Sequence, residues 1–411
     1  MGMIEYSEAL ARVLDLARPL PPRAVPLQEA LGRVVAEDVR AVDPVPPFTN
    51  SAMDGFAVRW QDCREAGPGQ PVQLRVLGEI PAGRPDPPAL EPGAALRIMT
   101  GALLPEGADA VVPVEQAEHG TGWMSLARPV RAGAHVRRAG EDVAAGGLVV
   151  PKGTVLRPAE IGVLAAVGCA WPRVHPQPRV AVITTGDELV DAGQHPGPGQ
   201  IRDANIHSLC AQAVAAGAQV RAFPRVADRT EAVRQALDQA LAWADVVLTN
   251  GGISVGDFDF IKEVLERSGA VQAFWRVAQK PGGPLGLWTL GERLVFGIPG
   301  NPVAAMVMVE EYVRPALRRM AGQDRLHRPE RRGRLAAPWS RTGPPGRLDL
   351  LRVVARERGG ELEVALTGPQ GSGLLSSMLR ANALALVPGD VQALPAGGEV
   401  LLHLIDEPED H

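Results

Sequence analysis

The greatest capacity for chemistry lies in the stretch from Thr249 to Asp259, which follows an apolar run, Asp245 to Leu248, that predicts a buried strand. Adjacent glycines at a strand's end let the backbone bend sharply and approach a ligand closely. A hydroxyl and two carboxylates come next, just before a helical pattern over Phe260 to Arg267. Peptide N–H groups at such a helix start can hold phosphate, and carboxylates can hold a hard cation such as Mg2+. The residues with these properties are Gly251, Gly252, Ser254, Asp257 and Asp259.

An ordinary strand-to-helix turn with an acidic N-cap explains that stretch too, because short glycine motifs are weak evidence. Two further loops favour a ligand site. Thr185 to Glu188 and Pro299 to Pro302 each follow an apolar strand pattern. The second of these loops opens a long helical pattern, with Asn301 as the N-cap and Pro302 at the first helical position.

Parallel strands place their carboxyl ends at one edge of a sheet, which is where ligands of α/β proteins bind. We therefore expect the three loops to lie on one rim. A further segment, Gln279 to Pro284, adds Lys280 on a rigid turn. Carboxylates, anion-holding amides and a cation together are what metal-assisted phosphate chemistry requires. The sequence therefore predicts a site of that kind.

Two groups of acids lie earlier in the chain. Asp54 stands among small residues in the segment Asn50 to Val58, and Glu141 and Asp142 follow Gly140. Each group could equally well stabilise its own loop. The eight histidines show no ligand spacing, so a zinc site or a His-based triad is not expected.

Alternating strand and helix patterns from residue 179 to about 322 predict βα units and a mainly parallel sheet. Short β-like runs separated by Pro and Gly predict two small β domains. Residues 1–43 are too short for a core of their own, so we expect them to pack with 141–178. The predicted fold class is α/β plus β in several domains: a discontinuous linker domain over 1–43 and 141–178, an inserted β domain over 44–140, an α/β domain over 179–326 and a C-terminal β domain over 327–411.

Composition points to a soluble, globular protein. The 411 residues carry a net charge of −5, which gives no reason to expect nucleic acid or an anionic membrane as a partner. Three cysteines, Cys63, Cys169 and Cys210, form no CxxC pair, so a disulfide framework is not expected and a reducing compartment fits. No apolar run approaches the ~20 residues of a membrane span, and the acidic amphipathic start is unlike a secretory signal. We expect a cytoplasmic protein.

Several motifs occur in a fixed order through most of the chain. Any one is weak, but together they resemble the MoeA proteins, which are molybdopterin molybdenumtransferases related to the E domain of gephyrin. Gly368 to Met378 resembles the C-terminal domain of that family more loosely. The segments that carry the resemblance are Phe48 to Ala57, Met99 to Ala102, Gly107 to Val112, Arg138 to Asp142, Thr185 to Leu189, Gly251 to Asp259, Lys280 to Gly282 and Gly297 to Val303.

The resemblance implies a fold and a reaction. It implies four domains, among them a mainly parallel α/β sandwich domain like that of the MogA proteins, and an elongated homodimer. The implied reaction combines adenylylated molybdopterin with molybdate to give molybdenum cofactor and AMP, with Mg2+ as cofactor. A MogA-type protein and molybdoenzymes are further candidate partners.

The resemblance also implies a site shared between subunits, in which acids of the inserted β domain meet the α/β domain of the other subunit. Asp257 and Asp259 are the candidate metal ligands. The candidate catalytic residues are Asp54, Asp142, Glu188 and Lys280. The candidate substrate-binding residues are Thr100, Gly101, Thr185, Gly186, Asp187, Gly251, Gly252, Ser254, Pro299, Gly300, Asn301, Pro302 and Ser372.

One position departs from the family pattern, which reads Lys-Pro-Gly-Lys-Pro where this chain has Gly283 after Lys280-Pro281-Gly282. A lysine that could help to bind molybdate is therefore replaced by glycine. Either another cation serves the site, or this chain is a weak or specialised paralogue. Two other functions stay open: a MogA-like molybdopterin adenylyltransferase, and a carrier or scaffold that binds molybdopterin without turnover.

Overall fold

The computed structural model describes residues 2–251, 260–407 and 409–410. The chain divides into two compact units. The first comprises Met1–Arg23, Gly32–Ala36 and Val174–His411, and the second comprises Ala24–Leu31 and Glu37–Arg173. Two short strands, β1 (Arg23–Ala24) and β12 (Arg173–Val174), lie where the chain passes between the units.

The first unit contains an α/β domain built on a mixed sheet with the strand order β16-β13-β17-β21-β20-β18. The first four strands in that order run parallel, and β20 and β18 are antiparallel to their neighbours. The mainly parallel sheet expected from the sequence is therefore confirmed. The strands are β13 (Arg179–Thr185), β16 (Gln219–Val226), β17 (Val246–Asn250), β18 (Val271–Trp275), β20 (Gly286–Leu290) and β21 (Arg293–Ile298).

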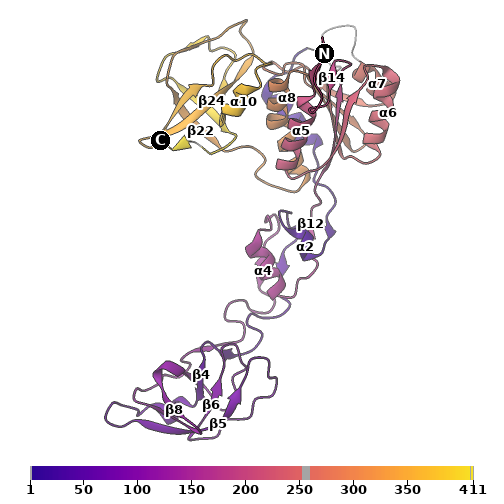
Figure 1. Cartoon of the computed structure of the whole chain (residues 1–411). Helices are drawn as coiled ribbons and strands as arrows, with labels where there is room; N and C mark the ends of the chain where they lie inside the picture. The colour runs from indigo at the N-terminus through magenta and orange to yellow at the C-terminus, as the bar shows by residue number, and fades with distance from the viewer. Residues whose placement is uncertain (1, 252–259, 408, 411) are drawn as a thin grey trace. The chain divides into compact units, whose positions relative to one another are not determined.

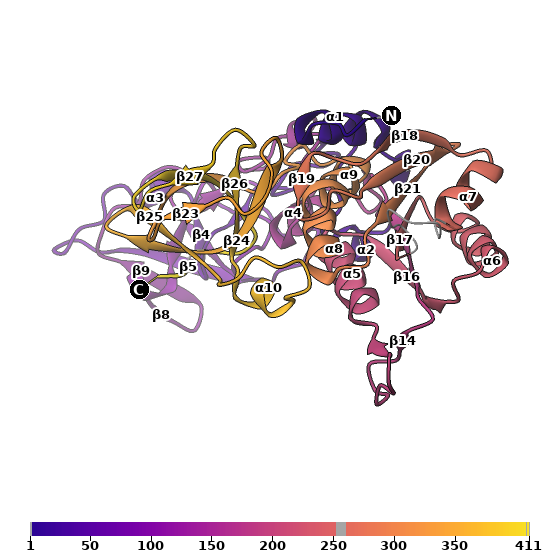
Figure 2. The same ribbon diagram turned by 90° about the horizontal axis from the view of Figure 1, so that it is seen from above.

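Helices cover both faces of this sheet, because successive strand residues point to opposite sides and both sides are apolar. Val180 and Val182 of β13 join one hydrophobic core, whereas Ala181 and Ile183 join another. Figures 1 and 2 show the two helix layers on either side of the strands. One layer holds α5 (Ala204–Ala215) and α8 (Pro302–Met308), and the other holds α6 (Thr230–Leu241) and α7 (Phe260–Arg267).

The long helix predicted to begin at Pro302 is confirmed, but it is not uniform. It runs through α8, a π-helical turn over Val309–Val313 and α9 (Arg314–Met320). Asn301 occupies the N-cap position without a capping bond from its side chain. The π turn was not expected, since no Gly or unusual spacing in the sequence marks it.

The first helix, α1 (Tyr6–Leu16), packs within the first unit. Ala9 and Val13 are fully buried in the core that also holds Ala316 and Leu317 of α9. Residues 1–23 thus depart from the expected grouping of 1–43 with 141–178, whereas residues 24–31 and 37–43 fall in the same unit as 141–173. The physical reason is that the apolar face of α1 finds a large helical core in the α/β domain.

The C-terminal part of the first unit is a β domain whose strands close on themselves in the order β24-β25-β22-β28-β26, with β26 pairing back to β24. Closure removes free sheet edges. The expected C-terminal β domain is confirmed. The elements are β22 (Glu330–Leu335), β23 (Trp339–Ser340), β24 (Leu348–Arg358), β25 (Glu361–Leu366), α10 (Ser376–Arg380), β26 (Ala383–Val387), β27 (Ala393–Leu394), β28 (Glu399–Leu404) and β29 (Glu409–Asp410).

The second unit contains the inserted β domain, with the strand order β7-β4-β6-β5-β9-β8. Each β-like run expected from the sequence here forms a strand. A separate ribbon pairs β10 with β3. The elements are β3 (Asn50–Ser51), β4 (Gly55–Val58), α3 (Trp60–Cys63), β5 (Val72–Ile80), β6 (Ala94–Ile98), β7 (Ala110–Pro113), the 3-10 turn Val114–Gln116, β8 (Glu118–Gly120), β9 (Trp123–Leu126) and β10 (Val136–Arg137).

The rest of the second unit is a small helix-and-strand portion. Its strands β2 (Val39–Arg40) and β11 (Leu148–Val150) pair antiparallel, and α2 (Leu27–Ala30) packs beside α4 (Pro158–Ala166). Among the helices of the described residues, none is both long enough and apolar enough to cross a membrane.

Candidate functional site

The three predicted loops of the α/β domain meet at one edge of its sheet, since β13, β17 and β21 are parallel neighbours. The backbone N–H of Gly251 donates to the carbonyl of Ile298 at 3.3 Å. A Cβ on Gly251 would lie 2.5 Å from the carbonyl oxygen of Thr185, and Gly251 has a φ of +92°. Only glycine fits this close approach of two loops.

Two asparagines hold the same edge together. Asn205, near the start of α5, donates from Nδ2 to Asn250 Oδ1 at 2.8 Å and to the carbonyl of Gly300 at 2.6 Å. Asn250 donates in turn from Nδ2 to the carbonyl of Pro299 at 2.8 Å. Asn250 is buried, so its bond to Pro299 forms away from water, and together these bonds fix the Pro299–Gly300 backbone.

Carboxylates lie exposed on this edge. Glu188 turns back over the chain, so that a Cβ on Gly186 would lie 2.6 Å from Glu188 Oε2. Asp187 accepts from the N–H of Asp228 at 3.3 Å. Thr185 Oγ1 is buried and has no hydrogen-bond partner among the residues that the structure describes. The edge thus offers two exposed carboxylates and one unsatisfied hydroxyl.

Small-molecule sites are typically cavities of about 300–1,000 Å3. A cavity of about 610 Å3 lies beside this edge. It is bounded by β19 (Gln279–Lys280) with the loop after it, by the Pro299–Asn301 loop and by the C-terminal β domain. The N–H of Val303 donates to the Ser372 carbonyl at 3.1 Å, which joins the two domains at the cavity wall. Lining residues include the predicted Lys280, Pro299, Asn301 and Ser372.

The charge of this cavity is one-sided. Lys280 and Arg347 both line it, and no Asp or Glu is among its described lining residues. Lys280 Nζ donates to the carbonyl of Thr342 at 3.2 Å and contacts Thr342 Oγ1 at 3.4 Å, which are neutral acceptors. In the part of the chain described, neither cation forms an ion pair with a carboxylate, and Asp349, which interacts electrostatically with both, forms its ion pair with Arg341. The cavity is therefore suited to an anion.

In the second unit, two predicted residues are brought together. Asp54 Oδ1 accepts from the backbone N–H and from the hydroxyl of Thr100, each at 2.7 Å. The N–H bond and then the hydroxyl bond lower the pKa of the exposed Asp54 carboxyl. Gly101 forms the adjoining turn with a φ of +80° and donates from its N–H to the Ser51 carbonyl. Asp54 is therefore held as a carboxylate.

Asp142 lies exposed in the loop after β10. Its N–H donates to the carbonyl of Val45 at 3.0 Å, and the N–H of Arg138 donates to Glu141 Oε2 at 2.8 Å. Because β10 pairs with β3, this loop and the Asp54 loop both adjoin that ribbon. The remaining predicted residues, Gly252, Ser254, Asp257 and Asp259, lie outside the described residues.

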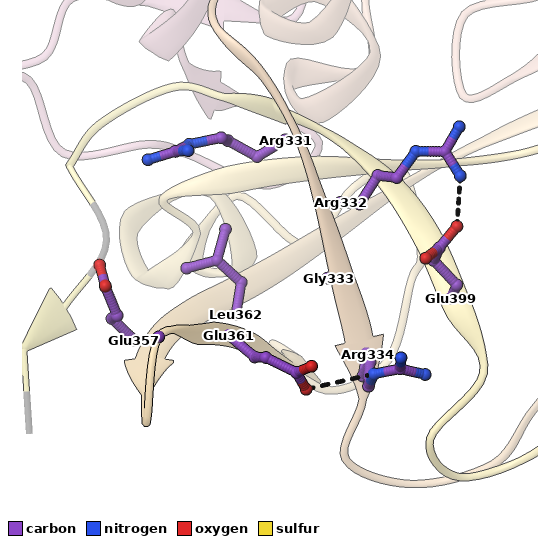
Figure 3. A pocket seen from close by; sticks show the side chains of 9 residues that line it. Arg331, Arg332, Gly333, Arg334, Glu357, Glu361, Leu362 and Glu399 are labelled. Atoms are coloured by element: carbon purple, nitrogen blue, oxygen red, sulfur yellow. Dashed lines mark hydrogen bonds and ion pairs between the residues drawn. The ribbon is translucent and has the colours of Figure 1, made fainter.

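A second cavity, of about 310 Å3, lies on the C-terminal β domain and holds none of the predicted residues (Figure 3). Its charges largely pair with one another, Arg332 with Glu399 and Arg334 with Glu361. Such mutual pairing leaves little net field for a ligand. The cavity at Lys280 is the better candidate site.

Family models match the chain from end to end. They are the MoeA N-terminal region (domain I and II) over residues 4–168, the probable molybdopterin binding domain over 181–319, and the MoeA C-terminal region (domain IV) over 332–405. The α/β fold with its carboxylate edge and the flanking β domains are thus those of one multi-domain family. The chain belongs to the MoeA family.

Named relatives agree with this assignment. A Mycobacterium tuberculosis protein named molybdopterin molybdenumtransferase 2 is 39% identical over 402 residues, covering 96% of this chain and 97% of that one. A Bacillus subtilis molybdopterin molybdenumtransferase is 35% identical and covers 98% and 94%. The crystal structure of a molybdopterin biosynthesis MoeA protein from Pyrococcus horikosii matches with a TM-score of 0.82 at 30% identity, covering 99% of this chain and 100% of that chain.

Sequence reasoning missed Arg347, Asn205 and Asn250 as parts of the site. Arg347 stands in a Gly- and Pro-rich stretch that reads as surface, and only the tertiary fold brings it to the cavity. Asn250 carried a usable signal, since a polar amide directly ends an apolar strand.

Proposed function

We propose that this protein inserts molybdate into adenylylated molybdopterin, releasing AMP and giving molybdenum cofactor. Membership of the MoeA family carries the general class, a transferase of molybdenum cofactor biosynthesis. The observation that carries the specific proposal is the cavity with two cations and no described carboxylate, next to a carboxylate-bearing sheet edge. That pairing suits one small oxyanion and one phosphate-linked substrate.

In this proposal Lys280 and Arg347 hold molybdate. Arg347 takes the role of the lysine that Gly283 replaces, because it supplies a second cation to the same cavity from the C-terminal β domain. A guanidinium presents several N–H donors in a fixed plane and suits a tetrahedral oxyanion as well as a lysine does. In this proposal Arg347 thus restores the molybdate affinity that the missing lysine would otherwise supply.

The pterin substrate lies, we propose, along the sheet edge. Backbone groups and one hydroxyl without a partner among the described residues face the substrate there. They belong to Thr185, Gly186, Gly251, Pro299, Gly300 and Asn301. In the reaction the bond between the adenylyl phosphorus and the pterin-side phosphate oxygen breaks. AMP leaves, and molybdenum is transferred to the pterin. Glu188, exposed beside Gly186, is placed to orient water or a molybdate oxygen at that phosphorus.

Mg2+ fits this edge because it needs few protein ligands when substrate phosphates supply the others. Among the described residues no three His, Cys, Asp or Glu side chains form a metal cage. Mg2+ is commonly bound by one or two carboxylates plus substrate phosphates, and the exposed Asp187 and Glu188 offer such carboxylates. Asp257 and Asp259 remain the proposed additional ligands. When bound, Mg2+ offsets the negative charge of the pyrophosphate.

The acids of the second unit, Asp54 and Asp142 with Thr100, act in our proposal on the α/β site of a partner subunit in a homodimer. The dimer is supported by the apolar helix α4, which buries Leu164 but leaves Val163 39% exposed. Exposed apolar side chains on one small portion of the chain are compatible with a protein partner there. Other exposed large apolar side chains of this small portion are Leu31, Val42, Leu148, Val155 and Trp171.

The deciding experiment measures AMP release from adenylylated molybdopterin with Mg2+ across a molybdate titration. We expect molybdate-dependent release by the wild type and near-complete loss in Glu188→Ala, with Glu263→Ala on exposed α7 as the control. Tight pterin binding without release at any molybdate concentration would leave a carrier and overturn the transferase. Production of adenylylated molybdopterin from ATP and molybdopterin would instead indicate the MogA-like adenylyltransferase.

Mixing inactive subunits tests the shared site. Asp54→Asn and Glu188→Ala proteins are each dissociated, mixed and reassembled. If the site is shared, mixed dimers keep one intact site, and about a quarter of the wild-type activity returns. No recovery, with mixed dimers shown to have formed, would place both acids within one subunit's site.

The compartment and partners follow the same proposal. Cys63, Cys169 and Cys210 are free thiols, as suits a reducing cytoplasm. A MogA-type protein supplying the adenylylated substrate and molybdoenzymes receiving the product are the proposed protein partners.

A further inference from the structure

The loop that shapes the cation-lined cavity is held from inside the protein by one buried amide. Gln279 is 1% exposed and directly precedes Lys280. Its Nε2 donates to the carbonyl of Pro281 at 3.2 Å and contacts the carbonyl of Gly282 at 3.5 Å. Two consecutive carbonyls of the cavity loop therefore depend on a single NH2 group.

The other end of that amide is fixed by Tyr312. The hydroxyl of Tyr312 donates to Gln279 Oε1, and both side chains are buried. Burial, with a smaller contribution from Glu311, raises the pKa of Tyr312 well above its ordinary value, so the phenol keeps the proton that it donates. The donor fixes the orientation of the amide, because Oε1 must face Tyr312 and NH2 must then face the loop.

Packing leaves the loop little freedom to adopt another shape. Gly282 has a φ of +86°, and a Cβ there would lie 2.4 Å from Met308 Cε. Met308 also contacts Gln279, with its sulfur 2.9 Å from Nε2. The loop backbone therefore rests on Gln279 and Met308 at once.

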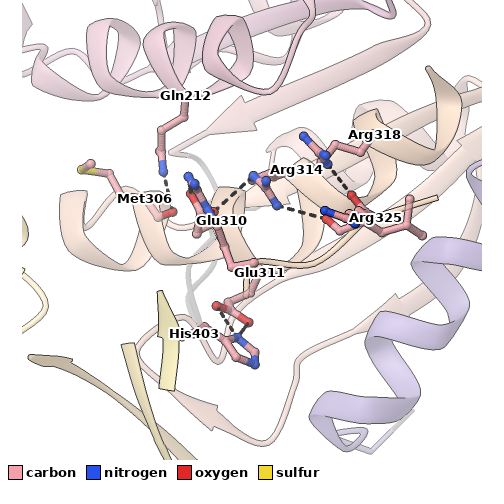
Figure 4. Close-up of polar contacts among 10 residues, drawn as sticks. Gln212, Met306, Glu310, Glu311, Arg314, Arg318, Arg325 and His403 are labelled. Carbon is pink, nitrogen blue, oxygen red and sulfur yellow. Dashed lines mark hydrogen bonds and ion pairs between the residues drawn. The ribbon is translucent and has the colours of Figure 1, made fainter. Parts of the chain in front are cut away.

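The π turn explains why Tyr312 reaches this position. In a π turn the extra residue rotates its side chains relative to a regular helix. Here Glu310, Glu311 and Tyr312 in succession are all buried. Glu310 pairs with Arg314, and Glu311 contacts His403 (Figure 4). Glu310 also pairs with Arg328, and Glu311 accepts from Tyr6. The hydroxyl of Tyr312 donates to Gln279.

We propose that Gln279 and Tyr312 are positioning residues that set the geometry of the oxyanion cavity by fixing the Lys280–Gly283 backbone. The inference rests on the proposed function, since molybdate is taken as the oxyanion. Tyr312 does not line the cavity, and Gln279, which does line it, acts in this proposal through the loop backbone rather than on the anion. A shift of the loop by about 1 Å moves Lys280 relative to the anion, and displacements of that size have large effects on binding geometry.

The test compares two variants, each of which removes one tyrosine hydroxyl in or beside the π turn. Tyr312→Phe removes the donor to Gln279, and Tyr6→Phe removes the donor to Glu311, which does not reach the cavity loop. Molybdate binding is measured by calorimetry without pterin, alongside the midpoint of thermal unfolding. We expect Tyr312→Phe to weaken molybdate binding roughly tenfold and Tyr6→Phe to change it by less than about twofold.

A double variant separates positioning from general stability. In Gln279→Met with Tyr312→Phe both members of the hydroxyl–amide pair become apolar, which avoids the unpaired Gln279 Oε1 of Tyr312→Phe alone and restores part of the thermal stability. The loop carbonyls still lack their donor, so we expect molybdate binding to remain weak. Recovery of binding in step with stability, or Tyr312→Phe binding equal to wild type, would overturn the inference.

These outcomes are separate from those of the proposed function. A wild type that releases no AMP on molybdate addition overturns the transferase, yet the calorimetric comparison of Tyr312→Phe with Tyr6→Phe still decides the positioning role. Unchanged binding in Tyr312→Phe overturns the positioning role while the transferase stands.

Discussion

Two loops that carry proposed catalytic residues are built in contrasting ways. The Lys280 loop is held from beneath by the buried Gln279 and by Met308, and it forms one wall of a cavity. The Asp54 loop is exposed, and its carboxylate is held by two hydrogen bonds from one neighbouring residue, Thr100. The first loop depends on the core of its domain, whereas the second depends on a local turn.

The contrast shows where each loop can fail. A change beneath Lys280 alters both stability and anion geometry, because the same buried contacts serve both. A change beside Asp54 alters its charge state and little else. A site that joins a rigid anion cavity to exposed acids also explains why a second subunit is needed to cover those acids in our proposal.

The largest effect is expected from Lys280→Ala. Removing one of two cations from a cavity without described carboxylates should lower kcat/KM for molybdate about 100-fold, near 3 kcal/mol. Steady-state AMP release across molybdate concentrations measures it. Lys280→Arg should retain part of the activity. A kcat/KM equal to wild type in Lys280→Ala would remove the basis for comparing the two loops.

A second prediction concerns the buried pair behind the π turn. His403 Nδ1 lies 2.9 Å from Glu311 Oε2 (Figure 4). Burial lowers the pKa of His403, but the hydrogen bond and charge of Glu311, with Glu330 and Glu310, more than offset it, so the pKa is raised. The contribution of protonated His403 to the stability of the folded protein is therefore complete below the pKa of His403 in the unfolded chain. It is lost as the pH rises through the higher pKa of His403 in the folded protein. Burial is the chief cause that lowers the pKa of nearby His327.

His403→Gln should accordingly lower the free energy of unfolding by about 3 kcal/mol at pH 6 and by less at pH 9. Chemical denaturation at both pH values measures it, with exposed His195→Gln as the control. A loss that is equal at the two pH values would show that the charge on His403 does not contribute.

A smaller gain is expected from Gly283→Lys. A Cβ at this position would lie 3.3 Å from the Gln279 carbonyl oxygen and 3.5 Å from that of Val277, so a side chain fits with slight adjustment. A third cation at the cavity should tighten molybdate binding by about threefold, because Arg347 already supplies the second. Calorimetry of Gly283→Lys and Gly283→Ala separates charge from backbone effects. Tightening of a hundredfold or more would mean that Arg347 does not serve the anion.

The smallest effect is expected from Thr100→Val. It removes the hydroxyl donor but keeps the N–H donor, which is the larger cause of the lowered pKa of Asp54. The pKa should rise part of the way to its ordinary value, which moves only the acidic limb of the pH–rate profile. Carboxyl chemical shifts followed by NMR across pH measure it, and Thr100→Ser should behave as wild type. An unchanged pKa would show that the hydroxyl bond is absent in solution.

Much of the fold could be predicted from the sequence where a local pattern decides it. The apolar strand at Val246–Asn250 and the helix beginning at Pro302 follow from runs and capping residues that neighbours cannot easily override. The placement of α1 could not be predicted, since its apolar face fits any large core. The antiparallel strands β18 and β20 were missed because partial burial blurs their pattern.

The site residues likewise fall into those that a local sequence pattern predicts and those that only the tertiary structure reveals. Thr185 and the Pro299–Asn301 loop could be placed because parallel strands bring their ends to one edge. Lys280 lies instead on β19, which pairs with β24 of the C-terminal β domain. Arg347 and Gln279 could not be placed, since an arginine in a loop and a glutamine before a lysine acquire roles only through contacts distant in sequence. Asp257 and Asp259 remain predictions as metal ligands.

The measurement that tests the central claim most directly is anomalous diffraction at the molybdenum edge from crystals soaked in molybdate. The account predicts a single strong peak in the cavity between Lys280 and Arg347, and its loss in Lys280→Ala crystals soaked in the same way. A peak at the Arg331–Arg334 cavity instead, or no peak at saturating molybdate, would contradict it.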